Sequence, residues 1–446
     1  MHEIELTTEK MAFEGRAIAR VNRFVYFVEG ALPGEKVRAA LIRRKRNHAF
    51  ARVLEVLEPS PYRQPTPCPV FGICGGCAFQ QMAYPAQLQM KRDVLIESLH
   101  GVPGVPERVT DVLGTDSAFH FRNKMVFAFG MKDGELILGL HVKGDWQSIV
   151  STDVCLLESP ESNEVIKRTV AYFRQHSVPL FDDERGEGFL RHLVVREGKH
   201  TGDRMVHLHA AAPHPAFERF ADTIGELATT CLVSYHRTVP EAAPPEQTFI
   251  LSGSGKIRDK LNEFTFEIGP ATFFQTNTLQ AEKLFRILTA WAAEIRPRMA
   301  VDLYAGTGPI AIHLSAATER VLAIESHADS VERMRRNLEL NAIRNVEAIH
   351  AEVERSPQGV FPANADLVVV DPPRPGLHRK AVDLLLNAAP ANLIYVSCNP
   401  ATLARDLKLF CEAKYAVETI QPVDMFPHTF HIEAVARLRR PGPRQE

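Results

Sequence analysis

The chain has 446 residues, of which 45% are hydrophobic and 24% are charged, and its formal net charge is -2. This length exceeds what one hydrophobic core accommodates, so we expect two or three domains of ordinary globular composition. No apolar run reaches the roughly 18 residues of a membrane span, the polar start "MHEIELTTEK" is not typical of a signal peptide, and the net charge gives no overall attraction to nucleic acid; we expect a cytoplasmic protein.

Residues 1–61 alternate short β-rich segments with turns, as in "GRAIARV", "RFVYFVEGALPGEKVRAALIRR" and "AFARVLEVL". Short strands bounded by Gly and Pro-Gly predict a small antiparallel barrel. Within it, residues 43–46 ("RRKR") form a basic run, which is compatible with a solvated face or with a phosphate-binding surface. The proline-rich "EPSPYRQPTPCPV" is typical of a linker that ends the barrel.

Residues 62–260 have a mixed pattern that predicts a central α+β domain. It opens with Cys68, Cys74 and Cys77 in "CPVFGICGGC", whereas Cys155 stands alone further along. In a cytosolic chain, such a group indicates metal or cluster ligation rather than disulfides. A helix is expected at "YPAQLQMKRDVLIESLHGV", followed by several strands such as "LRHLVVREG" and "MVHLHAAA".

Residues 261–446 show a regular alternation of apolar strands and amphipathic helices. Strands are expected at "MAVDLY", "RVLAIES", "ADLVVVD", "NLIYVSC" and "EAVARLRR". This alternation predicts a doubly wound, mostly parallel sheet covered on both faces, a Rossmann-like α/β domain. Ligands of such sheets bind beyond the carboxyl ends of the strands, so the residues at those ends are the candidates for a site.

The first two strands of this domain end in features suited to an adenosine-type ligand. Gly306 and Gly308 bracket a tight turn before a helix, and Glu325 ends the next strand. A plain turn would also explain the glycines, but a carboxylate at this distance can hold the two hydroxyls of a ribose. Position 311 is Ala, so the pyrophosphate-binding G-x-G-x-x-G is incomplete, which favours S-adenosylmethionine.

The later strands deliver a carboxylate and a thiol to the same edge. Asp371 precedes two prolines, Cys398 precedes Asn-Pro, and Glu433 lies at the start of the last strand. The alternative is that Asp371 only opens a rigid turn and that Cys398 is a small hydrophobic residue of the core. A thiol, a base and a methyl donor together suit methylation of uracil carbon 5, in which a thiolate adds to carbon 6 and a base later removes the carbon 5 proton.

Five motifs occur in order along the chain: "GPATFFQTN", "DLYAGTG", "DPPRPG", "SCNPATLARDL" and "DMFPHTFHIEAV". With them the sequence resembles the RNA uracil-5-methyltransferase family, and specifically its iron–sulfur members, over nearly the whole chain. The resemblance implies that Cys398 is the nucleophile and Glu433 the proton acceptor. It implies that S-adenosylmethionine is held by Gln275, Tyr304, Glu325, Asp371 and, on spacing alone, Glu352. Pro309 and Phe430 depart from residues common in the family, Asn and Gly respectively.

The resemblance also gives the cysteines an interpretation. Cys68, Cys74, Cys77 and Cys155 would ligate a [4Fe-4S] cluster, three close and one distant, with a four-cysteine zinc site as the alternative. The spacing is not C-x3-C-x2-C, so radical cleavage of the methyl donor is not implied. Cys231 and Cys411 are expected to be core or surface thiols.

The N-terminal barrel resembles a TRAM domain, which implies RNA binding and favours phosphate contact by residues 43–46. "FHFRNKMVFAFG" matches a further stretch of the family, so Arg122, Asn123 and Lys124 are candidate RNA contacts, with a surface hairpin as the alternative. We therefore expect a monomer that methylates uridine in RNA, 23S rRNA ahead of tRNA. The alternatives are a cytosine-5 or amino-group methyltransferase and a non-catalytic RNA-binding or chaperone protein.

Overall fold

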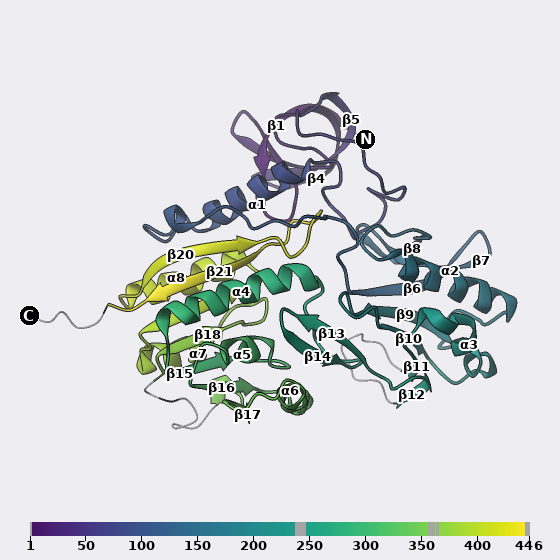
Figure 1. Ribbon diagram of the computed structural model, residues 1–446. Helices are drawn as coiled ribbons and strands as arrows, with labels where there is room; N and C mark the ends of the chain where they lie inside the picture. The colour runs from purple at the N-terminus through teal and green to yellow at the C-terminus, as the bar shows by residue number, and fades with distance from the viewer. Residues whose placement is uncertain (1, 237–246, 356–361, 363–364, 442–446) are drawn as a thin grey trace, which may run out of the picture.

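The computed structural model describes residues 2–236, 247–355, 362 and 365–441. Figure 1 shows three parts: a small barrel, a central sheet and a catalytic sheet, with a long helix lying between the barrel and the catalytic sheet. Among the described residues, no helix combines the length and the apolar character needed to cross a membrane.

The N-terminal part is a closed five-stranded barrel in the order β1-β2-β3-β5-β4. Small buried side chains such as Ala17, Ala39 and Ala51 face its interior, which lets the strands close tightly. The barrel is not entirely antiparallel as expected, because β3 and β5 pair in parallel. Its strands are β1 Glu3–Met11, β2 Ala17–Val21, β3 Phe24–Glu29, β4 Lys36–Arg44 and β5 His48–Glu58.

An irregular segment with the first three cysteines leads from the barrel into helix α1, Tyr84–Ser98. Pro85 at its first turn suits a helix start, because proline has no amide hydrogen to leave unpaired there. One face of α1 packs on the barrel through Met90 and Val94. Leu95 joins the core of the catalytic sheet, so α1 links these two parts.

The central part is a seven-stranded sheet in the order β12-β11-β10-β9-β6-β7-β8. Helices α2 (Pro160–Gln175) and α3 (Phe220–Ile224) cover the face whose core includes Phe127, Leu193 and Leu208. The strands are β6 Lys124–Lys132, β7 Glu135–Val142, β8 Asp145–Ser151, β9 Leu190–Glu197, β10 Arg204–Ala210, β11 Thr230–Tyr235 and β12 Gln247–Ser252. Short 3-10 turns occur at Pro106–Arg108, Pro215–Phe217 and Gly225–Leu227.

A hairpin of β13 (Ile257–Leu261) and β14 (Phe264–Ile268) connects the central part to the catalytic part. The boundary expected between residues 260 and 261 falls inside this hairpin. Its apolar side chains, such as Phe266 and Ile268, belong to the same core as the first helix of the catalytic part, α4 (Thr278–Ile295).

The catalytic part is a seven-stranded sheet in the order β17-β16-β15-β18-β19-β21-β20, in which β21 alone runs in the opposite direction to the other strands. Alternate residues of each strand enter two separate cores, one against α4, α5 and α6 and one against α7, α8 and the end of α1. This is the expected doubly wound arrangement. The strands are β15 Met299–Leu303, β16 Arg320–Glu325, β17 Val346–His350, β18 Leu367–Val370, β19 Asn392–Ser397, β20 Ala416–Val423 and β21 Glu433–Arg439. The remaining helices are α5 Pro309–Leu314, α6 Ala328–Leu340, α7 Arg379–Ala388, α8 Pro400–Glu412 and the 3-10 turn η4 Val353–Arg355.

Candidate active site and cysteine pocket

The turn after β15 is built for close approach of a ligand. Tyr304 has a φ of 65°, Gly306 a φ of 55° and Gly308 a φ of 89°. A Cβ at Gly306 would meet no atom within 4 Å, whereas one at Gly308 would lie 2.5 Å from Met334 Cγ. Gly308 is therefore required by packing, and the space beside Gly306 remains open to a ligand.

Glu325 ends β16 and is fixed by this turn. Its Oε2 accepts a hydrogen bond from the Gly306 amide (2.9 Å), and its Oε1 accepts one from the His327 amide (2.8 Å). These bonds hold the carboxylate at the edge of the sheet beside the open space. On the other side, the Tyr304 hydroxyl donates to Glu354 (2.8 Å) in the 3-10 turn after β17. The side chain of Glu352, two residues earlier, is exposed.

The charge of Asp371 is coupled both to Asp302, near the end of β15, and to Cys398. Burial raises the pKa of Asp371, the residue after β18, to about 7. Burial, and then the charges of Asp371 and Glu325, raise the pKa of Asp302 well above its usual range. Asp302 Oδ2 accepts from the Ala311 amide (3.0 Å), and its Oδ1 has no partner among the described residues.

Cys398 follows β19 directly and is half-buried. Asn399 caps α8 by accepting from the Ala401 amide (3.1 Å), and its side-chain amide donates to the Arg374 carbonyl (3.2 Å). The chain therefore turns immediately after the thiol, where Cys398 and Asn399 are both partly exposed. Burial, followed by the charges of Glu433 and Asp371, raises the pKa of Cys398 to about 11.

Glu433 opens β21, which lies next to β19 in the sheet, and its side chain is buried. Burial first, and then the charge of Asp371, raise its pKa well above the usual range of a glutamate, while Arg374 acts in the opposite direction. Glu433 Oε2 has no hydrogen-bond partner among the described residues. A carboxylate of raised pKa is a stronger base than an ordinary glutamate, and its free oxygen is available to accept a proton.

The charges of Cys398, Asp371 and Glu433 influence one another, so these three side chains lie close together at one edge of the sheet. Sequence reasoning missed Arg374, whose guanidinium charge opposes the rise in pKa of both Cys398 and Glu433. The available signal was its place in "DPPRPG", between two prolines that follow a strand-end acid. Phe430, which departs from the family pattern, packs edge-on against Phe13 of the barrel with ring centroids 6.0 Å apart.

Gln275 lies in the segment between β14 and α4. Its carbonyl accepts a hydrogen bond from the Asn123 side chain (2.8 Å), which also donates to Thr278 Oγ1 (2.9 Å). Asn123 is only 4% exposed. The expectation that Asn123 contacts RNA is therefore wrong: its side-chain amide joins the central part to the segment at the start of α4.

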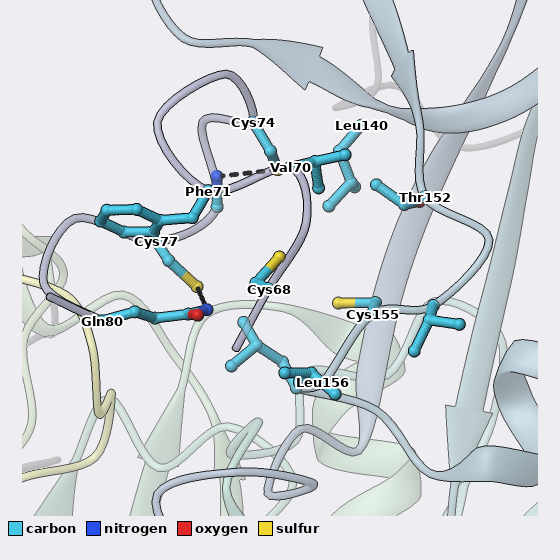
Figure 2. A pocket seen from close by; sticks show the side chains of 13 residues that line it. Cys68, Val70, Phe71, Cys74, Cys77, Gln80, Leu140, Thr152, Cys155 and Leu156 are labelled. Carbon is cyan, nitrogen blue, oxygen red and sulfur yellow. Dashed lines mark hydrogen bonds between the residues drawn. The ribbon is translucent and has the colours of Figure 1, made fainter. Parts of the chain in front are cut away.

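The four cysteines expected to act as ligands line one pocket. Figure 2 shows Cys68, Cys77 and Cys155 around a common space, with Cys74 above them. Burial raises the pKa of Cys77 to about 11 and that of Cys155 to about 12, and neighbouring thiols of the same set contribute to both shifts. Within the described residues, however, no three His, Cys, Asp or Glu side chains are arranged to hold a single metal ion.

Arg122 borders this pocket. Its guanidinium lies close enough to Cys77, Cys155 and Cys74 for their charges to influence its pKa, which burial lowers. Its Nε is buried and has no acceptor among the described residues. The Arg122 guanidinium is thus coupled to the thiols, although the residue remains partly exposed, and its contact with RNA stays a prediction. A buried donor without an acceptor is uncommon and calls for a missing partner.

Two family models match the chain. The tRNA (uracil-5-)-methyltransferase model matches residues 251–440, and the TRAM domain model matches residues 2–54. Proteins named uncharacterized RNA methyltransferase are similar over their whole length. One from Clostridium tetani is 34% identical over 98% of both chains, and one from Gloeobacter violaceus is 36% identical over 96% of this chain and 95% of its own.

A solved structure is similar to all three parts. It is the tRNA (uracil-54, C5)-methyltransferase of Pyrococcus abyssi in complex with S-adenosyl-L-homocysteine. The TM-score is 0.78 at 26% identity, and the match covers 98% of this chain and 100% of the other. These likenesses confirm the expected methyltransferase fold, the TRAM barrel and the enzyme class. The chain belongs to the RNA uracil-5-methyltransferase family, as a member with an N-terminal TRAM domain.

Proposed function

We propose that this RNA uracil-5-methyltransferase acts on a uridine of 23S rRNA, with Cys398 as nucleophile and Glu433 as proton acceptor. The observation that carries the two roles is the meeting of a strand-end thiol with a buried carboxyl of raised pKa beside the cofactor turn. The combination of a TRAM barrel with a cysteine set favours rRNA by analogy. The relative from Pyrococcus abyssi is named for tRNA uridine 54, so tRNA is the second candidate.

The proposed reaction uses the two residues in succession. The Cys398 sulfur forms a bond to carbon 6 of the uracil, and the electron pair moves to carbon 5, which then takes the methyl group supplied by S-adenosylmethionine. Glu433 removes the proton from carbon 5, and the returning electron pair breaks the bond between carbon 6 and sulfur. A uracil within a duplex is out of reach of a half-buried thiol, so the target lies in a loop or is flipped out.

We propose that Gln275, Tyr304, Glu325, Glu352 and Asp371 hold S-adenosylmethionine. The open space beside Gly306 and the partnerless Asp302 Oδ1 fit a ligand at this turn. Glu325 sits where it could accept from ribose hydroxyls in addition to the backbone amides. Pro309 at the first turn of α5 supplies no side-chain hydrogen bond, so contacts to the ligand there come from other residues.

We also propose that Cys68, Cys74, Cys77 and Cys155 hold a [4Fe-4S] cluster. The four thiols line one pocket, and three close cysteines with one distant cysteine are a known set of ligands for such a cluster. The unpaired Arg122 Nε fits as a donor to a group carrying negative charge. We assign the cluster a structural role and no step of the methyl transfer.

The test combines mapping with trapping. 5-Methyluridine is mapped across 23S rRNA and tRNA from cells with and without the gene; loss of a site in 23S rRNA supports the proposal, and loss in tRNA supports the second candidate. An RNA containing 5-fluorouridine at that site should form a stable covalent adduct, since carbon 5 then has no proton to remove. An adduct that persists with Cys398→Ser contradicts the assignment of the nucleophile.

The non-catalytic alternative is tested with Glu433→Gln. If cells carrying this variant lose 5-methyluridine but keep the growth and ribosome-assembly properties of the wild type, an RNA-binding or chaperone role explains those properties. If 5-methyluridine and the wild-type growth and ribosome assembly are lost together, methylation accounts for those properties.

A further inference from the structure

The segment between β20 and β21, residues 424–432, leads directly into Glu433; we call it the His428 loop. All three parts of the molecule contact it. Phe13 of the barrel packs on Phe430, and Phe119 of the central part packs on the His428 ring with centroids 4.5 Å apart. The start of the loop is fixed to α1, where Lys91 forms a buried ion pair with Asp424 (2.5 Å).

His428 is held from two sides. Its carbonyl accepts hydrogen bonds from the amides of Ala78 (2.7 Å) and Phe79 (3.0 Å), the two residues after Cys77. Its own amide donates to Gln87 Oε1 (2.9 Å), and Gln87 Nε2 lies 3.1 Å from His428 Nδ1. Gln87 Nε2 also donates to the Phe79 carbonyl (2.9 Å), so one fully buried side chain binds the cysteine segment and the loop together.

These contacts impose an unusual backbone conformation. His428 has a φ of 63°, a left-handed value that is uncommon for residues other than glycine, although histidine adopts it more readily than most. Its side chain is 2% exposed, and its Nε2 has no partner among the described residues. The loop is thus held at His428 by Gln87 and by the turn at residues 78–79.

Glu433 lies five residues beyond His428, and its Oε2 makes no hydrogen bond that would orient it from within the site. The position of this carboxylate therefore depends on its backbone, which begins β21 opposite Val423 of β20 and directly follows the His428 loop. Cys398 is attached differently, through β19 and the Asn399–Arg374 contact. Displacement of the His428 loop should consequently affect the carboxylate more than the thiol.

We propose that Gln87 is a positioning residue for the final step of the reaction: by holding His428 it sets Glu433 against the carbon 5 proton of the methylated uracil. The proposal rests on the proposed function, because it takes Glu433 as the proton acceptor. Since Cys77 immediately precedes the same turn, the contacts that position Glu433 also join it to the cysteine pocket.

The experiment measures which step fails. Full-length enzyme is incubated with total RNA from cells lacking the gene and with S-adenosylmethionine labelled with tritium on its methyl group. After nuclease digestion, label that stays on denatured protein counts methylated adducts awaiting proton removal, and label in free nucleosides counts product. Gln87→Leu is compared with wild type, with Glu433→Gln as reference and with Gln89→Leu, an exposed glutamine of the same helix, as control.

We expect Gln87→Leu to raise the ratio of protein-bound to free label about tenfold or more, since misplacement by about 1 Å can cost a hundredfold in rate. Glu433→Gln should do the same and Gln89→Leu should match the wild type. Binding of S-adenosylhomocysteine checks that the catalytic part is folded. If Gln87→Leu does not fold, His428→Asn decides, because asparagine tolerates the left-handed backbone and removes only the imidazole contacts.

Two results would overturn the proposal, and they are distinguishable. A high ratio in Glu433→Gln with a wild-type ratio in folded Gln87→Leu, or in His428→Asn where that variant decides, would show that Gln87 does not position the base. A wild-type ratio in Glu433→Gln itself would show that Glu433 is not the proton acceptor, and both this proposal and that assignment would fall.

Discussion

Replacing Lys91 with methionine should destabilise the protein strongly. The ammonium group of Lys91 and the carboxylate of Asp424 are both fully buried and lie 2.5 Å apart, and Lys91 also donates to the Phe426 carbonyl (3.0 Å). Removing one partner of such a pair costs about 3–5 kcal/mol, because an uncompensated charge is left in the interior. The Tyr84 hydroxyl (2.9 Å) still donates to Asp424, so we expect the lower end, about 3 kcal/mol.

The assay is denaturant unfolding followed by the fluorescence of Trp291, which lies in α4, in a Trp146→Phe background. The double variant Lys91→Met, Asp424→Leu serves as the control, because replacing both charges by apolar groups is often nearly neutral. It should recover most of the lost free energy of unfolding. A loss below about 1 kcal/mol in Lys91→Met, or a double variant less stable than the single one, would refute the reasoning.

Four further outcomes are expected. The rate of Cys398 alkylation by iodoacetamide should rise about tenfold per pH unit from pH 7 to 9.5. The pKa of Cys398 is about 11, so the reactive thiolate is the minor form over this whole range. Mass spectrometry of the peptide that contains Cys398 measures the rate. Asp371→Asn should speed this alkylation at fixed pH by removing a neighbouring charge; an unchanged rate would contradict the coupling. Anaerobically purified enzyme should contain about four iron and four sulfide per chain, absent from Cys155→Ser, whereas stoichiometric zinc would contradict the cluster. Replacing the exposed basic run 43–46 with glutamine should weaken RNA binding and leave kcat unchanged at saturating RNA. The slope of log binding constant against log salt concentration should become shallower by about 0.7 for each phosphate that is no longer neutralised. An unchanged slope would show that the run is only a solvated face.

Several predictions from the sequence hold because they depend on local pattern. The apolar strand runs of the catalytic part had to be covered on both faces, and two separate cores do cover them. The Asn-Pro after Cys398 had to end its strand, and α8 begins at Pro400. The enzyme class and the TRAM barrel follow from motifs whose order along the chain is specific to the family.

Other features depend on contacts between distant residues. Strand β20 was not expected, and it lies outside β21 at the sheet edge, an order that sequence position alone does not determine. Asn123 was expected at the RNA surface, but its amide joins two parts of the molecule 152 residues apart in the chain. A role for Arg374 was not predicted, because its charge lowers the pKa of Cys398 and Glu433 only where the tertiary fold brings the three residues together.

The sequence by itself determined the chemistry available to this protein: a thiol after β19, a carboxylate at the start of β21 and a glycine turn after β15, each placed by glycine, proline and apolar pattern. Tertiary structure alone decided how those groups affect one another. The pKa of about 11 at Cys398 arises from burial and from carboxylates far away in the chain, and the left-handed His428 exists because Gln87 and the turn after Cys77 hold it. Burial and charge act through space, whereas a sequence pattern records only neighbours along the chain.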